Sequence, residues 1–179
     1  MAASGKLDSS GNYAMLQDLS GDGFGEWTHI VFAGGDSLPL FFFYSANSQG
    51  AASGELDDNG NCITLQDLSG DGFGEWTHIV FEGDPSVLFF YNEGTRGAAS
   101  GRIDSSGNFT MLQDLSGDGF GEWTHIAPTS RRLFFYSADT RGAASGELDD
   151  SGNYTMLQDL TGDQFGLWTH IAATQAGIP

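Results

Sequence analysis

The sequence predicts an all-β protein that folds as a β-propeller of four repeats, each forming a four-stranded antiparallel blade. The first observation is the motif Ala-Ala-Ser-Gly, which begins at Ala2, Ala51, Ala98 and Ala143, in steps of 49, 47 and 45 residues. Steps of about 40 to 50 residues are typical of propeller blades. The second is that no apolar stripe follows a helical period, and the 27 glycines are spread along the chain like turn residues. The third is a set of segments so aromatic that both of their faces need cover, which blades stacked around an axis provide.

Four short strands are expected in each full repeat. In the first repeat, residues 2–8 form a small, polar strand that ends in a turn, and residues 13–19 form the second strand. The third strand, 27–32, is rich in β-branched and aromatic residues. The fourth, 40–44, reads Leu-Phe-Phe-Phe-Tyr. In a flat sheet with one wet face, several of these phenylalanines would be exposed, at about 1.5 to 3 kcal/mol for each side chain.

The repeats are expected to make one domain, although the chain ends leave the closure of the ring open. The domain is predicted to span 1–179, with repeats at 2–50, 51–97, 98–142 and 143–179. The aromatic fourth strand occurs three times, whereas the first three strands occur four times. Three arrangements fit this count: a four-bladed ring with one incomplete blade, an assembly in which chains complete one another, and an excerpt from a longer array. A β-solenoid or a trefoil-like barrel is the alternative fold.

The composition excludes several partners. Six Lys and Arg against 24 Asp and Glu give a formal net charge of -18, which argues against nucleic acid and against anionic membrane surfaces. The charge suits bound cations, although plain acidic solubility explains it too. Cys62 is the single cysteine, so no intrachain disulfide is expected. We expect no membrane insertion and no signal peptide in this chain, and a homo-oligomer and an extracellular or cell-surface location fit these features.

One segment organises the whole chain. Residues 18–30 recur almost unchanged at 67–79 and 114–126, and in altered form at 159–171. Its polar residues, Asp18, Ser20, Asp22 and Glu26, stand at positions one, three, five and nine of a loop, with a glycine at position six. Oxygen ligands at alternate positions of a short loop are typical of a calcium site, with the backbone carbonyl of Phe24 as a further ligand. The same residues are also good turn formers without any metal.

The calcium interpretation extends to the other copies. The corresponding ligands are Asp67, Ser69, Asp71, Phe73 and Glu75 in the second loop, Asp114, Ser116, Asp118, Phe120 and Glu122 in the third, and Asp159, Thr161 and Asp163 in the fourth. The fourth loop has Gln164 in place of the glycine and Leu167 in place of the glutamate, so we expect weak binding or none there.

The loop Asp-x-Ser-Gly-Asp-Gly-x-Gly-Glu, followed by an apolar and then an aromatic strand, resembles the FG-GAP and VCBS type repeats. Those repeats form propeller blades in integrin heads and in several fungal and bacterial lectins. The resemblance covers all four copies but is specific only over the loop. It implies that calcium braces each blade. This chain departs from the family in having Ser at position three, Glu at position nine and Trp-Thr-His-Ile in the strand, and it lacks a Phe-Gly-Gly-Ala-Pro signature.

Near-identical copies present near-identical surfaces, and repeated weak contacts give avidity. Together with the resemblance, this predicts a multivalent, calcium-braced lectin that binds glycans, with a structural or protein-interaction propeller without sugar binding as the alternative. A sugar site needs an aromatic face and planar polar groups. The candidates are Trp27, Trp76, Trp123 and Trp168, with Asn12, Asn61, Asn108 and Asn153. Packing between blades explains the tryptophans equally simply, and turn geometry explains the asparagines.

Two further readings concern chemistry. His29, His78, His125 and His170 also repeat, and they predict either structural hydrogen bonds or a ring of metal ligands. Catalytic residues of a repeat protein usually break the repeat symmetry. The residues that break it here are Cys62, Arg131, Arg132, Gln164 and Leu167, which make no nucleophile, base and orienting group. The sequence therefore predicts a protein that is not an enzyme.

Overall fold

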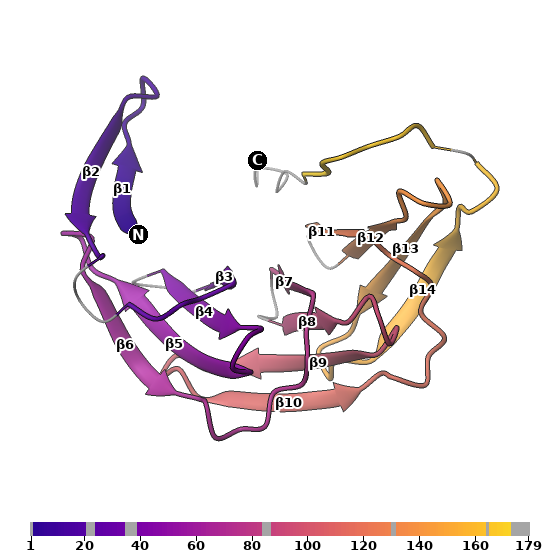
Figure 1. Ribbon diagram of the computed structural model, residues 1–179, viewed down its shortest axis with the longest axis horizontal. Coiled ribbons are helices and arrows are strands. Elements are labelled where there is room, and N and C mark those ends of the chain that lie inside the picture. Colours follow the sequence, from indigo (N-terminus) through magenta and orange to yellow (C-terminus); the bar gives the residue numbers. More distant parts are fainter. Residues whose placement is uncertain are drawn as a thin grey trace. The chain divides into compact units, whose positions relative to one another are not determined.

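A computed structural model of the chain describes residues 2–20, 24–34, 39–83, 87–129, 132–163 and 165–172. Every regular element in these ranges is a β-strand, and none is a helix long and apolar enough to cross a membrane (Figure 1). The strands that open the repeats are β1 (Ala3–Leu7), β5 (Gly50–Leu56), β9 (Ala98–Ile103) and β13 (Ala143–Leu148). They are followed by β2 (Tyr13–Asp18), β6 (Cys62–Asp67), β10 (Phe109–Asp114) and β14 (Tyr154–Asp159). The third strands are β3 (His29–Gly34), β7 (His78–Glu82) and β11 (His125–Thr129), and the aromatic fourth strands are β4 (Leu40–Ser45), β8 (Val87–Tyr91) and β12 (Arg132–Tyr136).

The strands form antiparallel sheets that are offset from the sequence repeats. Three sheets are four-stranded, with the orders β3-β4-β5-β6, β7-β8-β9-β10 and β11-β12-β13-β14. Each takes two strands from one repeat and two from the next. Strands β1 and β2 form a two-stranded sheet. The predicted all-β class and the four-stranded antiparallel blades are thus confirmed, and the aromatic strands lie at inner positions of the sheets, where they pair on both edges.

The chain divides into two compact units. Unit 1 comprises Met1–Phe73 with Ser105–Asn108, and unit 2 comprises Gly74–Asp104 with Phe109–Pro179. Unit 1 holds the sheets β1-β2 and β3-β4-β5-β6, and its core includes the fully buried Phe42 and Tyr44. Unit 2 holds the other two sheets, and Phe89 and Phe135 lie at its centre, with ring centroids 5.8 Å apart. The apolar runs of β4, β8 and β12 are therefore buried, as their two-sided apolar pattern predicts.

A serine and a glycine in each opening strand have separate roles. Ser4 donates from Oγ to the carbonyl of Gly60 (2.6 Å) within unit 1, and Ser100 donates to the carbonyl of Gly152 (2.8 Å) within unit 2. Each bond joins one repeat to the turn of the next. Beside the serine, Gly146 lies under the Tyr154 ring so closely that a Cβ there would be 2.3 Å from it. Glycine at this position lets a large aromatic side chain lie flat across the strand.

Candidate functional site

The repeated acidic loops are built as turns. In the third loop, Asp114 accepts hydrogen bonds from the backbone N–H of Ser116 (3.0 Å) and from its hydroxyl (2.6 Å). These two bonds, the hydroxyl first, lower the pKa of the Asp114 carboxyl below 3.8. The backbone N–H of Asp118 donates to the carbonyl of Leu115 (3.1 Å). Asp18, Asp67 and Asp159 accept the same backbone bond from the residue two positions on.

Two of the predicted calcium ligands in the third loop have other partners. Asp114 accepts a hydrogen bond from the Ser116 hydroxyl, and the Glu122 carboxylate pairs with Arg96. Across the described ranges, no three His, Cys, Asp or Glu side chains gather as a metal site. The structure therefore does not support calcium as the brace of the blades, and it shows hydrogen bonds of the turns in the loops. A cation at these loops remains a prediction.

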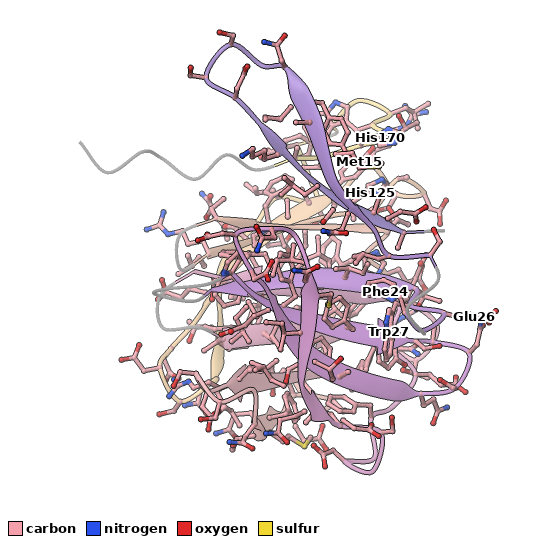
Figure 2. All side chains as sticks on the ribbon, turned by 90° about the vertical axis from the view of Figure 1, so that its left-hand side faces the viewer. Met15, Phe24, Glu26, Trp27, His125 and His170 are labelled. Carbon is pink, nitrogen blue, oxygen red and sulfur yellow. The ribbon has the colours of Figure 1, made fainter. Side chains whose placement is uncertain are left out.

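The remaining predicted ligands of the loops differ in their exposure. Glu26 is exposed and extends away from the sheet, whereas Phe24 packs inward beside Trp27 (Figure 2). Phe73 is buried in unit 1, with its ring 5.4 Å from that of Phe42. The side chains of Ser20, Ser69, Asp71, Glu75, Thr161 and Asp163 belong to exposed residues, and Asp22 lies outside the described residues.

The repeated tryptophans stack on the aromatic strands. The ring centroid of Trp27 lies 5.8 Å from that of Phe43, Trp123 lies 5.7 Å from Phe135, and Trp168 lies 5.1 Å from Tyr136. Trp76 makes the equivalent contact with Phe90 at 5.6 Å. Trp123 is buried, and Trp168 is exposed at 39%. The structure thus gives these side chains a packing role along the strands.

The repeated asparagines close the turns that follow the opening strands. The amide of Asn61 donates to Asp57 (2.8 Å), and the backbone N–H groups of Asn59 and Asn61 donate to the same carboxylate. Asn12 and Asn153 bind Asp8 and Asp149 in the same way, and Asn108 is exposed in its turn. The side-chain bond of Asn61 is the main cause that lowers the pKa of Asp57 below 3.8.

Two of the repeated histidines connect successive repeats of unit 2. The Nε2 atom of His78 lies 3.0 Å from the carbonyl oxygen of Thr124, and Nδ1 lies 2.9 Å from Oγ1 of Thr77. A carbonyl only accepts, so Nε2 carries the proton. His125 makes the same pair of contacts with Thr169 and Thr124, whereas His29 and His170 each approach the hydroxyl of the preceding threonine. These contacts favour the structural hydrogen bonds over a ring of metal ligands.

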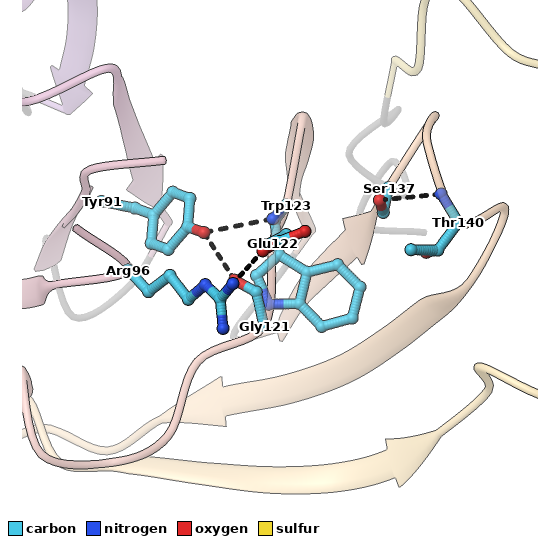
Figure 3. A network of polar contacts seen from close by, with 7 residues as sticks. All are labelled: Tyr91, Arg96, Gly121, Glu122, Trp123, Ser137 and Thr140. Carbon is cyan, nitrogen blue, oxygen red and sulfur yellow. Dashed lines mark hydrogen bonds and ion pairs between the residues drawn. The ribbon is translucent and has the colours of Figure 1, made fainter. Parts of the chain in front are cut away.

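A polar network in unit 2 brings together side chains that the sequence did not single out. The Arg96 guanidinium forms an ion pair with Glu122, and both side chains are about half exposed (Figure 3). The Tyr91 hydroxyl donates to the carbonyl of Gly121 (2.6 Å) and accepts from the backbone N–H of Trp123 (3.1 Å). Tyr91 therefore fixes the backbone on both sides of Glu122.

The turn that carries Arg96 is equally constrained. Arg96 has φ 59°, a left-handed conformation that is costly for a residue with a Cβ. Its N–H donates to the carbonyl of Asn92 (2.8 Å), and the Asn92 side chain accepts from the N–H of Thr95 (2.8 Å). The Asn92 amide also donates to the carbonyl of Glu75. Non-glycine residues held at positive φ by their surroundings concentrate at functional sites.

The Arg–Glu combination breaks the repeat symmetry. The two other turns at this position carry Gln49 and Arg141, also at positive φ. Leu167 stands where a glutamate would face Arg141, so an ion pair cannot form in that repeat. Among the described residues, Arg96 and Glu122 form the one salt bridge found. The sequence carries a signal of this asymmetry. Gln49 stands at the position of Arg96 in the first repeat, and Leu167 stands at the position of Glu122 in the fourth.

A hollow of about 260 Å³ includes in its lining the two residues that flank Glu122 in the sequence, but neither Glu122 nor Arg96. It is lined by Asp118, Gly119, Phe120, Gly121, Trp123, Tyr154 and Met156. Burial, followed by the charge of Asp118, raises the pKa of Tyr154 to about 12, so its hydroxyl is protonated at neutral pH. Unit 2 thus holds a carboxylate paired with a guanidinium and, next to it along the chain, an aromatic hollow lined by the neutral Tyr154.

No family model and no curated protein sequence matches the chain. Solved structures do. A protein from Lactobacillus plantarum is 22% identical over 88% of this chain and 48% of its own, with a TM-score of 0.62. A periplasmic gluconolactonase from Pseudomonas aeruginosa is 19% identical over 78% of this chain and 40% of its own (TM-score 0.55). A protein from Bacteroides fragilis described as a candidate 6-phosphogluconolactonase is 17% identical over 73% and 37%, respectively (TM-score 0.54).

These structures are propeller-like, with four-stranded antiparallel sheets, and they show the same fold for this chain. The chain spans about half or less of the length of each. The kinship specifically with FG-GAP and VCBS repeats is not among the findings.

The comparison corrects the functional predictions. The prediction of a calcium-braced, carbohydrate-binding lectin is contradicted, because the named neighbours are lactonases. The prediction that the protein is not an enzyme is contradicted by the same names. The physical reason for the first error is visible in the repeats: the tryptophans and asparagines proposed as sugar contacts pack on strands and close turns. The reason for the second is that an ion pair between two distant segments has no local motif.

Proposed function

We propose that this chain forms part of a propeller hydrolase that opens a lactone, the cyclic ester of a hydroxy acid. The observation that carries the proposal is the Arg96–Glu122 pair, which occurs once among the described residues; the residues on either side of Glu122 line an aromatic hollow. The fold likeness to two proteins named as lactonases supports the reaction class.

Glu122 and Arg96 supply the two functions that ester hydrolysis needs. The Glu122 carboxylate takes a proton from water while the water oxygen bonds to the lactone carbonyl carbon. The negative charge that develops on the carbonyl oxygen faces the Arg96 guanidinium, which stabilises it. When the ring C–O bond breaks, Glu122 returns the proton to the departing alkoxide. The product is the open hydroxy acid, and Tyr154 donates a hydrogen bond to a substrate oxygen.

The charge of the chain favours an uncharged substrate. A net charge of -18 produces a field that repels anions, and a phosphorylated lactone would approach against it. Within the candidate site, one arginine is already paired with a carboxylate, and the wall of the hollow adds Asp118. We therefore expect a neutral sugar lactone to be a better substrate than its phosphate.

The test is lactone opening followed by a pH-stat with glucono-1,5-lactone, corrected for the spontaneous reaction. The variants R96Q and E122L introduce residue types that other repeats carry at these positions, so the fold should tolerate them. Each is expected to lower kcat by about 100-fold or more. The control is Glu26→Gln, at the same loop position of the first repeat, and it should retain activity. Catalysis that survives in both site variants, or no acceleration by the unmodified chain, contradicts the proposal.

We also propose the finer kinship of the loops with FG-GAP and VCBS repeats. The spacing of Asp114, Ser116, Asp118 and Glu122 supports it. The strand after the loop does not, because Trp-Thr-His-Ile stands in place of a Leu-Ile-Val run. A sequence profile built from related chains would test this kinship, and a profile that aligns the loop glycines to a different repeat type would contradict it.

A further inference from the structure

Among the positions at which the second repeat differs from the others, one lies at the start of β6 in unit 1. In the fourth repeat, the first residue of β14 is Tyr154, opposite Leu148 in the register. In the second repeat, the first residue of β6 is Cys62, opposite Leu56. Tyr13 and Phe109 occupy this position in the first and third repeats. Cysteine thus replaces an aromatic ring.

In the fourth repeat, the Tyr154 ring fills a defined space. It packs 4.7 Å from the ring centroid of Phe120 and 5.8 Å from that of Phe135, and it lies over Gly146. Phe120, Trp123 and Phe135 are buried members of the unit 2 core against which Tyr154 packs. The ring therefore completes an aromatic cluster.

In the second repeat, Cys62 supplies no aromatic ring at the equivalent place. Gly54 stands where Gly146 accommodates Tyr154, but the atoms nearest a Cβ at Gly54 are the carbonyl oxygen of Ile63 and an edge atom of Phe43. At Gly5, Gly101 and Gly146, these atoms include the ring of the aromatic residue. The glycine that makes room for a ring is kept while the ring is absent.

The space beside Cys62 is open, and its lining side chains are mainly apolar. A cavity of about 100 Å³ is lined by Leu19, Phe24, Gly25, Trp27, Phe43, Ala52, Cys62 and Thr64. A second hollow of about 210 Å³ shares Leu19, Phe24, Phe43 and Cys62 and extends along Ile30 and Phe41. All of these residues belong to unit 1. Phe24 and Trp27 lie 5.6 and 5.8 Å from Phe43 and form the aromatic walls (Figure 2).

We propose that this cavity, the Cys62 pocket, binds a small planar aromatic molecule that packs against Phe24 and Phe43 and takes the place held by Tyr154 in the fourth repeat. Apolar cavities of about 150 Å³ in proteins stay dry and bind benzene-sized molecules, as one engineered cavity in a lysozyme shows. Aromatic rings gain further from offset or edge contacts with aromatic walls at 4.5 to 7 Å. Burial raises the pKa of the Cys62 thiol, which therefore stays protonated and lines the pocket as an apolar group.

Phenol is the probe, because it copies the side chain of Tyr154. Phenol is titrated into the full chain, and binding is followed by ligand-observed NMR and calorimetry. We expect one site with a dissociation constant near or below about 1 mM, which corresponds to weak binding. The variant C62Y restores the ring, so its affinity for phenol should fall at least tenfold. The variant C62S keeps the space and should bind phenol within about threefold of the unmodified chain.

A reciprocal variant and a labelling assay make the test independent of the folding of one variant. F109C removes the ring of the third repeat and should raise the stoichiometry for phenol from one to two. Phenol should also slow the reaction of Cys62 with an aromatic disulfide reagent in proportion to occupancy. Equal affinity in the unmodified chain and C62Y, equal affinity for cyclohexanol, or no protection of the thiol overturns the proposal. None of these readouts depends on lactone opening.

Discussion

Single hydroxyl groups hold neighbouring backbone segments together in unit 2. Tyr91 is fully buried, and its hydroxyl bridges a carbonyl and an N–H on either side of Glu122. Tyr136 does the same with Gly166 and Trp168 (2.6 and 3.1 Å). One hydroxyl thus satisfies two backbone groups that turns leave unpaired, which is the usual requirement for buried backbone.

At the residue scale, Tyr91→Phe should lower the free energy of unfolding by about 1 to 3 kcal/mol, because two backbone groups lose their partner. Urea unfolding measures the change. Tyr13→Phe is the control, since Tyr13 is 62% exposed, and it should stay within about 0.5 kcal/mol of the unmodified chain. A Tyr91→Phe variant as stable as the control would mean that water replaces the hydroxyl.

The residue scale is also where sequence reasoning succeeded least. The turn chemistry of Asp57 and Asn61 is local, and the alternative of turns without metal follows from it. Arg96 and Glu122 are 26 positions apart, and only the fold brings them together. Cys62 was noticed as a departure from the repeat, but the space that it leaves requires the positions of Phe24 and Phe43.

At the scale of strands and turns, periodicity made the architecture predictable. The apolar and aromatic residues on both faces of β4, β8 and β12 predicted burial on both faces, and these strands are largely buried. The offset between repeats and sheets did not follow from the pattern, because pairing partners are set by long-range hydrogen bonds. Turn positions such as Gly152 require glycine for two reasons. The backbone has φ 79°, and a Cβ there would lie 2.2 Å from Ser100 Oγ.

Glycine substitutions separate these two demands. Gly11→Ala adds a methyl group to open space at φ 82°, so it should cost only the left-handed conformation, about 1 to 2 kcal/mol. Gly152→Ala adds the clash and the loss of the Ser100 hydrogen bond, and it should be clearly more destabilising. Gly117→Ala, which meets nothing within 4 Å, is the control. Thermal unfolding ranks the three, and equal effects of Gly11→Ala and Gly152→Ala would contradict the close approach.

For the whole molecule, net charge opposes stability at neutral pH, whereas the hydrogen-bonded aspartates contribute stability there that is lost in acid. Seven turn aspartates have a lowered pKa because a side-chain hydrogen bond, and then backbone bonds, favour the ionised form: Asp8, Asp18, Asp57, Asp67, Asp114, Asp149 and Asp159. A lowered folded pKa contributes stability above the unfolded value of 3.8, and this contribution is lost as pH falls through the folded pKa.

We therefore expect Tm to fall steeply below about pH 3.8, the pH at which the unfolded carboxyls take up protons first. At pH 7, added NaCl should raise Tm, since it screens the repulsion of a chain with net charge -18. Calorimetric scans between pH 7 and pH 2, at low and high salt, measure both effects. The variant Asp149→Asn should blunt the acid transition slightly, and an unchanged Tm down to pH 2 would contradict the role of these turns.

Each four-stranded sheet takes two strands from one sequence repeat and two from the next. The boundary between two sequence repeats therefore falls in the middle of a four-stranded sheet. A duplication that adds one repeat would break one central strand pairing and create two equivalent strand pairings. No new type of contact surface between strands would have to evolve. Chains of different length could in this way arise by unequal recombination while every internal joint stays the same.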